Sequence, residues 1–152
     1  MGRFSGKIML VTGATSGIGR AVALRGAKEG ATVIAVGRNE ERGNAVVEAI
    51  ENKEGKAVFK KCDVSDKEAV KKLFAEIKEE FGKLDVAVNN AGIVGASKTV
   101  EELEDDDWSK VIDANLNSSL PKYLSNFPYF TGFPACALAK RYVFSLIFAL
   151  MR

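Results

Sequence analysis

The residues between Thr12 and Gly19 have the spacing of a phosphate-binding turn. The segment Thr12-Gly13-Ala14-Thr15-Ser16-Gly17-Ile18-Gly19 lies between an apolar run and a stretch with helical periodicity. At such a junction, phosphates meet the free N–H groups and the positive dipole end of a helix. We expect Gly13 to permit the turn, Gly17 to let phosphates approach, and Gly19 to let the helix pack close to the sheet. A purely structural glycine turn is the alternative.

The end of the second strand-like run would decide which dinucleotide binds. An acidic residue there would accept a hydrogen bond from the ribose 2′-hydroxyl of NAD and would repel a 2′-phosphate. This chain instead has Gly37 followed by Arg38. A guanidinium group suits bidentate phosphate binding, so the sequence predicts NADP(H) in preference to NAD(H). The alternative is that Arg38 is a solvent-exposed side chain without a ligand.

The chain contains no histidine, which narrows the possible chemistry. Ser-His-Asp and Cys-His catalysis are excluded, and the commonest metal ligand is missing. Cys62 and Cys136 are the two cysteines of the chain and lack metal-ligand spacing. We therefore expect no metal site and no disulfide framework, and a reducing cytoplasm is the favoured location.

Composition indicates one globular core. Of the 152 residues, 47% are hydrophobic and 28% are charged, which is typical of a single domain. The net charge of +2 comes from 22 basic and 20 acidic residues without a basic tract, so nucleic acid is not expected as a partner. No secretory signal precedes the first strand-like run. The apolar run at residues 142–151 is about half a bilayer span, so no membrane segment is predicted.

Strand-like and helix-like segments alternate along residues 7–116. Short apolar runs predict strands over residues 7–12, 31–36, 56–62 and 84–88. A first helix is expected over residues 18–29, with a stop at Gly30, and a second from the cap residue Asn39 to Gly55. A third is expected to begin at a capping box formed by Ser65 and Glu68, and a fourth covers residues 106–116. The third helix has a clear apolar face, formed by Val70, Leu73, Phe74, Ile77 and Phe81. This alternation predicts a parallel sheet covered by helices on both faces.

Two motifs resemble those of the classical short-chain dehydrogenase/reductase family. The glycine turn matches its Thr-Gly-x-x-x-Gly-x-Gly signature, and residues 89–92 match its Asn-Asn-Ala-Gly signature. The resemblance implies a Rossmann-type α/β fold: a doubly wound parallel sheet in three α/β/α layers, with strand order 3-2-1-4-5-6. It implies that Asn-Asn-Ala-Gly supports the sheet and borders the cofactor. Asp63 resembles the family's adenine-contacting Asp, although it could equally cap the following turn. The expected cofactor-binding residues are Thr12, Gly13, Thr15, Ser16, Gly17, Ile18, Gly19, Arg38, Asp63, Val64, Asn89, Ala91 and Gly92.

The catalytic motif of that family is not matched. Family members use a Tyr, a Lys four residues later, a Ser upstream and an Asn in a proton relay. None of the three tyrosines, Tyr123, Tyr129 and Tyr142, has a Lys at that distance. Asn115 matches the relay Asn by context, the alternative being an Asn that only caps a helix end. Lys140 fits the lysine position if Cys136 occupies that of Tyr, although an Ala-rich helix with a Lys is a common pattern.

The resemblance divides the chain into two parts. Residues 1–120 form the expected NAD(P)-binding domain, and residues 121–152 a divergent segment that packs on it, as a remnant of the active-site helix. Pro121, Pro128 and Pro134 interrupt the pattern there, so the fold is predicted to be incomplete in its second half. The fourth strand would then be an apolar edge of the sheet, which favours pairing with another chain. Family members also commonly dimerise through the helix that here carries Trp108 and the helix after it, so the resemblance implies a homo-oligomer.

The resemblance implies an NADP(H)-dependent oxidoreductase that transfers hydride between nicotinamide and a carbonyl or secondary alcohol. Because the Tyr-x-x-x-Lys motif is absent, we expect its activity to be impaired. A non-catalytic nucleotide-binding or interaction module is the alternative function. A third possibility is that the chain is a truncated or rearranged gene product of marginal stability.

Overall fold

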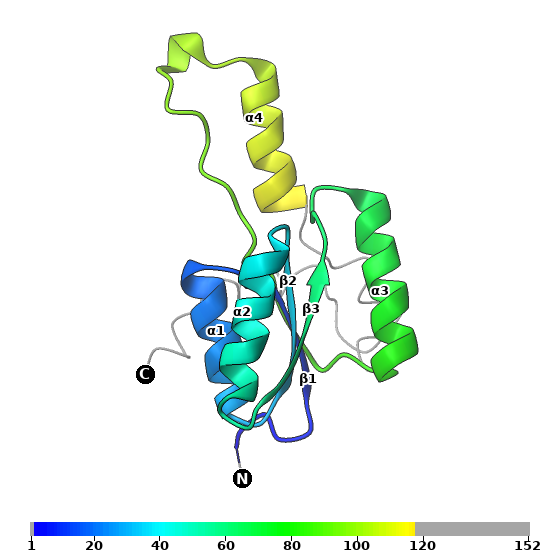
Figure 1. Cartoon of the computed structure of the whole chain (residues 1–152). Helices are drawn as coiled ribbons and strands as arrows, with labels where there is room; N and C mark the ends of the chain where they lie inside the picture. Colours follow the sequence, from blue (N-terminus) through cyan, green and yellow to red (C-terminus); the bar gives the residue numbers. More distant parts are fainter. Residues whose placement is uncertain (1, 118–152) are drawn as a thin grey trace.

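A four-stranded parallel sheet forms the centre of the structure. The structure is a computed structural model that describes residues 2–117 of the chain. Strands β1 (Ile8–Thr12), β2 (Thr32–Gly37), β3 (Lys56–Lys61) and β4 (Val86–Val88) lie in the order β3-β2-β1-β4, with all neighbouring pairs parallel (Figure 1). The predicted order of the first four strands is confirmed. The order also places the carboxyl ends of all four strands at one edge of the sheet.

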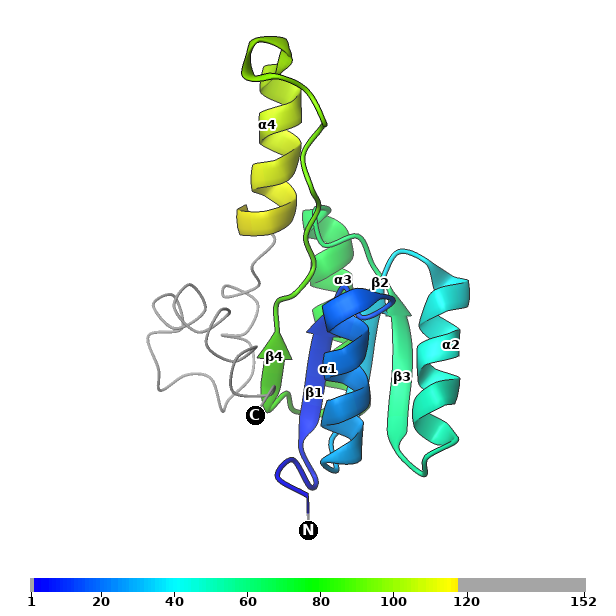
Figure 2. The same ribbon diagram turned by 90° about the vertical axis from the view of Figure 1, so that its left-hand side faces the viewer.

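Helices cover both faces of this sheet. Helices α1 (Gly17–Lys28) and α2 (Glu40–Glu51) lie on one face and α3 (Lys67–Phe81) lies on the other (Figures 1 and 2). Successive strand residues point to opposite faces, so Met9 and Val11 join the core under α1 and α2, while Leu10 joins the core under α3. Two apolar cores therefore sandwich the sheet, which confirms the predicted three layers.

Local capping chemistry sets where two of the helices begin. The Asn39 side chain accepts a hydrogen bond from the Arg42 backbone N–H at 2.8 Å, as predicted for the cap of α2. The predicted Ser65 cap of α3 is wrong, because Asp66 accepts from the N–H groups of Glu68 and Ala69. Ser65 instead donates its hydroxyl to Asp63 at 2.7 Å.

The end of α2 also differs from the prediction. We expected Gly55 to close this helix, but α2 ends at Glu51, with Asn52 as its C-terminal cap. The left-handed conformation in the following turn is adopted by Glu54, with φ of 59°. Gly55 is needed for another reason, since a β-carbon there would meet the Ile50 side chain.

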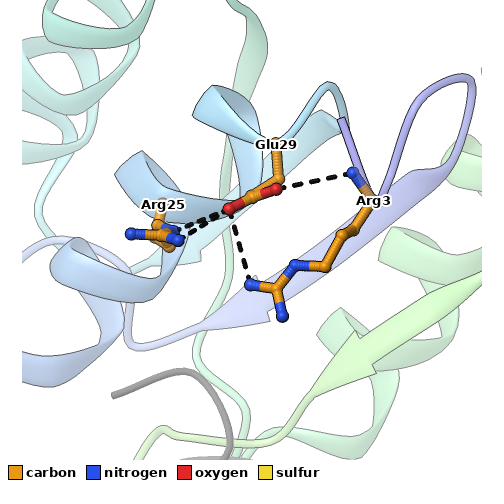
Figure 3. Close-up of polar contacts among 3 residues, drawn as sticks. All are labelled: Arg3, Arg25 and Glu29. Atoms are coloured by element: carbon orange, nitrogen blue, oxygen red, sulfur yellow. Dashed lines mark hydrogen bonds and ion pairs between the residues drawn. The ribbon is translucent and has the colours of Figure 1, made fainter. Parts of the chain in front are cut away.

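The N-terminal residues are fastened to the far end of α1. Glu29, just after α1, accepts hydrogen bonds from the Arg3 backbone N–H and guanidinium and from the Arg25 guanidinium (Figure 3). The Glu29 carbonyl accepts from the Phe4 N–H at 2.9 Å. The Arg3 bonds, followed by that of Arg25, lower the pKa of the Glu29 carboxyl. These contacts lie at the end of the sheet opposite the carboxyl ends of the strands.

Residues 93–117 form an arm that projects from the body, which comprises residues 2–92 (Figures 1 and 2). The arm contains a short 3₁₀ helix η1 (Val100–Glu102), helix α4 (Asp105–Ile112) and a π-helical turn η2 (Asp113–Asn117). The helix predicted over 106–116 is thus present over 105–117, with a π-helical last turn. No side chain of α4 is buried among the described residues, which contrasts with the largely buried strands β1 and β2 of the body.

Several sequence predictions fall outside the described residues. Lys140, Cys136, the three tyrosines and the predicted segment 121–152 all lie beyond residue 117. Within residues 2–117, no helix has the length and apolar character needed to cross a membrane. The same residues contain no cluster of His, Cys, Asp or Glu side chains that could hold a metal ion.

Candidate functional site

A pocket of about 930 Å³ opens at the carboxyl ends of the four strands. The segments that follow all four strands contribute to it, and the end of α4 adds an outer lip. This is the position at which doubly wound α/β sheets bind their ligands. The lining residues are Gly13, Thr15, Ser16, Gly17, Ile18, Gly37, Arg38, Asn39, Arg42, Cys62, Asp63, Val64, Ser65, Asn90, Ala91, Gly92, Ile93, Lys110, Asp113 and Ala114.

The turn after β1 presents backbone rather than side chains to the pocket. Gly13 and Gly17 adopt left-handed conformations, with φ of 65° and 52°, which side chains rarely tolerate. A β-carbon on Gly17 would meet no atom within 4 Å, so this position opens onto the pocket. The Ser16 side chain makes no capping hydrogen bond in the described chain. The first N–H groups of α1 are therefore free of a side-chain cap, as anion binding requires.

Gly19 is buried behind the turn and is not a lining residue. A β-carbon on Gly19 would collide with the Gly13 carbonyl oxygen and with the side-chain amide of Asn90. Its close approach is therefore to the turn and to Asn90, whereas we expected an approach to the sheet. Gly26 fills that expected role, because its β-carbon would press on the Met9 side chain of β1. The sequence analysis did not single out Gly26.

Thr12 and Asn90 fasten the end of β1 to the end of β4. The Thr12 hydroxyl accepts hydrogen bonds from the N–H groups of Asn90 and Ala91, both at 3.0 Å. The Asn90 amide donates to the Thr12 carbonyl at 3.1 Å. Thr12 is buried and does not line the pocket. These bonds provide the sheet support expected of the Asn-Asn-Ala-Gly signature.

The two asparagines of that signature differ in position. Asn89, expected to border a cofactor, does not line the pocket, whereas Asn90, Ala91 and Gly92 do. The Asn89 side-chain oxygen is buried and has no hydrogen-bond partner among residues 2–117. Asn90 lines the pocket, and its amide donates to the carbonyls of Thr12 and Gly13 in the glycine turn.

Asp63 and Arg38 form an ion pair at the pocket wall. Their carboxylate and guanidinium atoms Oδ2 and Nη1 lie 3.7 Å apart. Asp63 also accepts from the Ser65 N–H at 3.0 Å, so it caps the turn, as the alternative interpretation held. The Ser65 hydroxyl, and less strongly Arg38, lower the pKa of the Asp63 carboxyl. Asp63 is thus an anionic acceptor at the pocket wall, and Val64 lines the pocket beside it.

The segment after β2 carries positive charge and no carboxylate at the pocket. Gly37, Arg38 and Asn39 line the pocket in succession, and Arg42 joins them from the first turn of α2. Gly37 must be small, because its β-carbon would collide with the Thr15 methyl group. Arg38 was predicted from the sequence as a binding residue, whereas Arg42 was not. The predicted cap at Asn39 could have drawn attention to it, since the cap places the first turn of α2 beside Arg38.

Cys62 lines the pocket at the end of β3, but its thiol is unreactive near neutral pH. Burial, followed by the negative charge of Asp63, raises the pKa of the Cys62 thiol to about 11. The thiol therefore stays protonated near neutral pH, and a protonated thiol is a poor nucleophile.

Asn115 links the arm to the pocket lip. Its side-chain oxygen accepts from the Ile93 N–H at 2.8 Å, and its amide donates to the Ile93 carbonyl at 3.0 Å. This bracket holds a lining residue in place, which is neither of the two roles considered from the sequence. Its participation in a proton relay stays a prediction. Sequence spacing alone could not reveal the bracket, because the two residues are 22 positions apart.

The comparisons with known proteins agree with this geometry. The family model described as short chain dehydrogenase matches residues 7–131. A 3beta-hydroxysteroid dehydrogenase of Mediterraneibacter gnavus is 81% identical over 118 residues, which cover 78% of this chain and 43% of that protein. A 3-oxoacyl-[acyl-carrier-protein] reductase of Thermotoga maritima is 40% identical over 114 residues, covering 75% and 46%.

A solved structure gives the same result at the level of the fold. The crystal structure of a metagenomic short-chain oxidoreductase in complex with NADP aligns with a TM-score of 0.76 and 31% identity. The alignment covers 84% of this chain and 57% of that one. The chain therefore spans about half the length of the proteins that it matches.

Proposed function

The chain belongs to the short-chain dehydrogenase/reductase family, and from this premise we propose that it is an NADP(H)-dependent oxidoreductase acting on a carbonyl or a secondary alcohol. The observation that carries the proposal is the pocket at the carboxyl ends of the strands. Its floor is the glycine turn, and its rim at the end of β2 carries Arg38 in place of a carboxylate. We further propose that activity in this chain is impaired.

The pocket residues fit a dinucleotide segment by segment. The free N–H groups at the start of α1, with Gly17 leaving open space beside them, suit a pyrophosphate. Asp63 and Val64 suit the adenine end, where a carboxylate can accept from an exocyclic amine. Ile18 and Ala91 line the part of the pocket nearest the turn. When bound, the nicotinamide supplies or accepts a hydride, while the protein binds and orients it.

The preference for NADP(H) rests on Arg38. A guanidinium favours the 2′-phosphate, and no acidic side chain after β2 is placed to accept from a free 2′-hydroxyl. The NADP complex of the metagenomic relative supports this choice by analogy. NAD(H) is the weaker candidate.

The substrate class follows from the relatives. The Mediterraneibacter protein, 81% identical over 118 residues, is a 3beta-hydroxysteroid dehydrogenase. A 3-oxosteroid, or the matching 3β-hydroxysteroid, is therefore our first candidate substrate. The described residues are those of the nucleotide half, so the substrate proposal rests on the resemblance.

Impaired activity follows from the missing proton donor. A positioned general acid is typically worth about 10²- to 10⁴-fold in rate, and no tyrosine here precedes a Lys by four residues. Asn115, as a relay group, and Lys140, in the lysine position, are the proposed remnants of the catalytic set. In the described residues, Asn115 holds Ile93 at the pocket lip, so its contribution includes positioning.

A steady-state assay tests the enzymatic part of the proposal. NADPH consumption would be followed with a 3-oxosteroid and with a simple ketone, using the Gly17→Trp variant as the blocked-pocket control. We expect slow turnover that the variant abolishes. Turnover that survives Gly17→Trp would show that the pocket is not the active site.

The alternative is a non-catalytic nucleotide-binding or interaction module, favoured by the absent Tyr-x-x-x-Lys motif. Tight NADPH binding without any turnover would support it. In either case we propose a cytoplasmic homo-oligomer. The exposed Trp108 of α4 and the β4 edge, which pairs with β1 alone among the described strands, support the oligomer.

A further inference from the structure

We infer that the arm, residues 93–117, is a lid that closes over the pocket when a nucleotide is bound, and that Lys110 is the side chain through which the lid holds the ligand. This inference rests on the proposed function, in which the pocket binds a dinucleotide. It goes beyond that function because it assigns a movement and a ligand contact to the arm.

The walls of the pocket come from two separate parts of the molecule. The body contributes the glycine turn and the segments that follow β2, β3 and β4. The base of the arm contributes Ile93, Lys110, Asp113 and Ala114. A ligand that fills the pocket therefore contacts both parts. Such contacts favour the arrangement in which the arm and the body lie closest together.

Few interactions hold the arm against the body. Leaving aside Asp113 and Ala114, every hydrogen bond and ion pair that an arm residue forms within residues 2–117 joins it to another arm residue. No side chain of α4 is buried in this part of the chain. The arm also projects away from the body in two perpendicular views (Figures 1 and 2). Little apolar burial or hydrogen bonding therefore opposes a movement of the arm relative to the body.

The arm is braced internally, so it can move as one unit. The Lys98 ammonium pairs with Asp107 at 2.7 Å, which ties the segment leaving the body to α4. The Asn115 bracket on Ile93 closes the base of the arm. The chain enters the arm through Gly92, an exposed residue in irregular backbone just outside this bracket. Because glycine changes its φ and ψ angles at low steric cost, Gly92 is suited to act as the hinge.

Lys110 is the cation that the lid presents to a ligand. It lines the pocket from α4, and its ammonium forms no hydrogen bond or ion pair within residues 2–117. The carboxylate one turn earlier, Asp107, is already bonded to Lys98. Asp113, which lines the same lip, is engaged in an interaction of its own. Because a dinucleotide carries negative phosphates, the available ammonium of Lys110 favours the closed lid when the ligand is present.

Hydrogen exchange of the full chain with and without NADPH tests the inference. The informative amides are those of residues 100–107 at the tip of the arm, which do not line the pocket and so cannot be shielded by direct ligand contact. The variants are Lys110→Gln and, as the matched control, Ser109→Gln. Ser109 is an exposed residue of the same helix that does not line the pocket, so the control places the same side chain one position away.

We expect saturating NADPH to slow exchange over residues 100–107 by about threefold or more, because a closed arm opens less often. Lys110→Gln should weaken NADPH binding about fivefold and remove most of this slowing, while Ser109→Gln should match the wild type. Slowing that persists in full in Lys110→Gln would overturn the role of Lys110.

The lid and the proposed function fail in different ways. If calorimetry shows that NADPH binds the wild type but exchange over residues 100–107 is unchanged, the lid is wrong and the proposed function stands. If the folded wild type binds no NADPH, both are wrong.

Discussion

The body is stabilised mainly by burial of apolar side chains, whereas the arm is stabilised mainly by polar contacts. Strands β1 and β2 are covered on both faces, and residues such as Leu10 and Ile34 are completely buried. In the arm, no side chain of α4 is buried among the described residues, and Trp108 is 66% exposed. Polar contacts within the arm, such as the Asn115 bracket and the Lys98–Asp107 ion pair, hold it together. The floor of the pocket is therefore rigidly specified by burial, whereas its outer lip depends on a few hydrogen bonds.

Truncating one large apolar side chain in each region should give the largest contrast. Ile34→Ala would remove a fully buried side chain from the core under α3, and we expect a loss of about 4 kcal/mol in the free energy of unfolding. Trp108→Ala, in the exposed arm, should change it by less than about 0.5 kcal/mol. Urea denaturation of both variants measures this. A comparable loss for Trp108→Ala would mean that the arm is packed against something.

A methyl group at Gly19 tests the part of the body that shapes the pocket. The added β-carbon would collide with the Gly13 carbonyl and Asn90, so we expect a loss of about 3 kcal/mol and no detectable NADPH binding. Gly82→Ala is the matched control. It adds the conformational strain of a residue with φ of 68° but meets no atom, and should cost about 1 kcal/mol without affecting binding. Equal effects of the two variants would contradict the packing role of Gly19.

Acid should weaken the body through the Asp85 carboxyl. Burial alone would raise the pKa of the Asp85 carboxyl, but hydrogen bonds from the Ile8 N–H, Lys7 and Lys83 outweigh it and lower the pKa below the ordinary 3.8. A lowered folded-state pKa stabilises the protein above about pH 4, and this stability is lost as the pH falls through the folded pKa.

The Asp85→Asn variant isolates this contribution. We expect it to lose about 1.5 kcal/mol at pH 7, and the difference from wild type should vanish towards pH 2. The matched arm variant Asp106→Asn, at an exposed position of α4, should leave the free energy of unfolding at pH 7 within about 0.5 kcal/mol of the wild type. Unfolding measured between pH 2 and pH 7 provides the test, and a constant difference over that range would contradict it.

Loss of the two hydrogen bonds between Asn115 and Ile93 should give the smallest effect. Asn115→Ala removes both bonds to Ile93, so we expect faster hydrogen exchange at the Ile93 amide and a roughly fivefold weaker affinity for NADPH, equal to about 1 kcal/mol. Asn52→Ala, at the exposed end of α2, is the control. Unchanged exchange at Ile93 would show that the bracket does not hold the pocket lip.

The sequence predicted the strands well because burial and glycine stops act locally. Residues 8–12 and 32–37 were placed within one residue by apolar runs that end at Gly13 and Gly37. Caps were harder, because Ser65 and Asp66 are both good caps and the contact of Ser65 with Asp63 decides between them. The end of α2 differs by more, because the helix ends at Glu51 and Glu54, rather than Gly55, adopts the left-handed conformation.

The site was predictable where a motif coincides with a strand end and unpredictable where distant segments meet. Gly13, Gly17, Arg38 and Asp63 all follow strands and all line the pocket. Gly26 and Gly43 were missed because their need to be small depends on Met9 and Phe59, which the sheet brings against the helices. Pattern matching also could not separate Asn89 from Asn90, since both follow β4 and the hydrogen bonds between Asn90 and Thr12 are formed only in the fold.

The central claim is that the glycine turn forms the floor of an NADPH site, and calorimetric titration of the full chain tests it most directly. NADPH and NADH would be titrated into the wild type, Gly17→Trp and the control Gly82→Trp, which changes a left-handed glycine that does not line the pocket. We predict that the wild type and Gly82→Trp bind NADPH more tightly than NADH, and that Gly17→Trp binds neither while remaining folded. Undiminished binding by Gly17→Trp, or no binding by the folded wild type, would contradict the account.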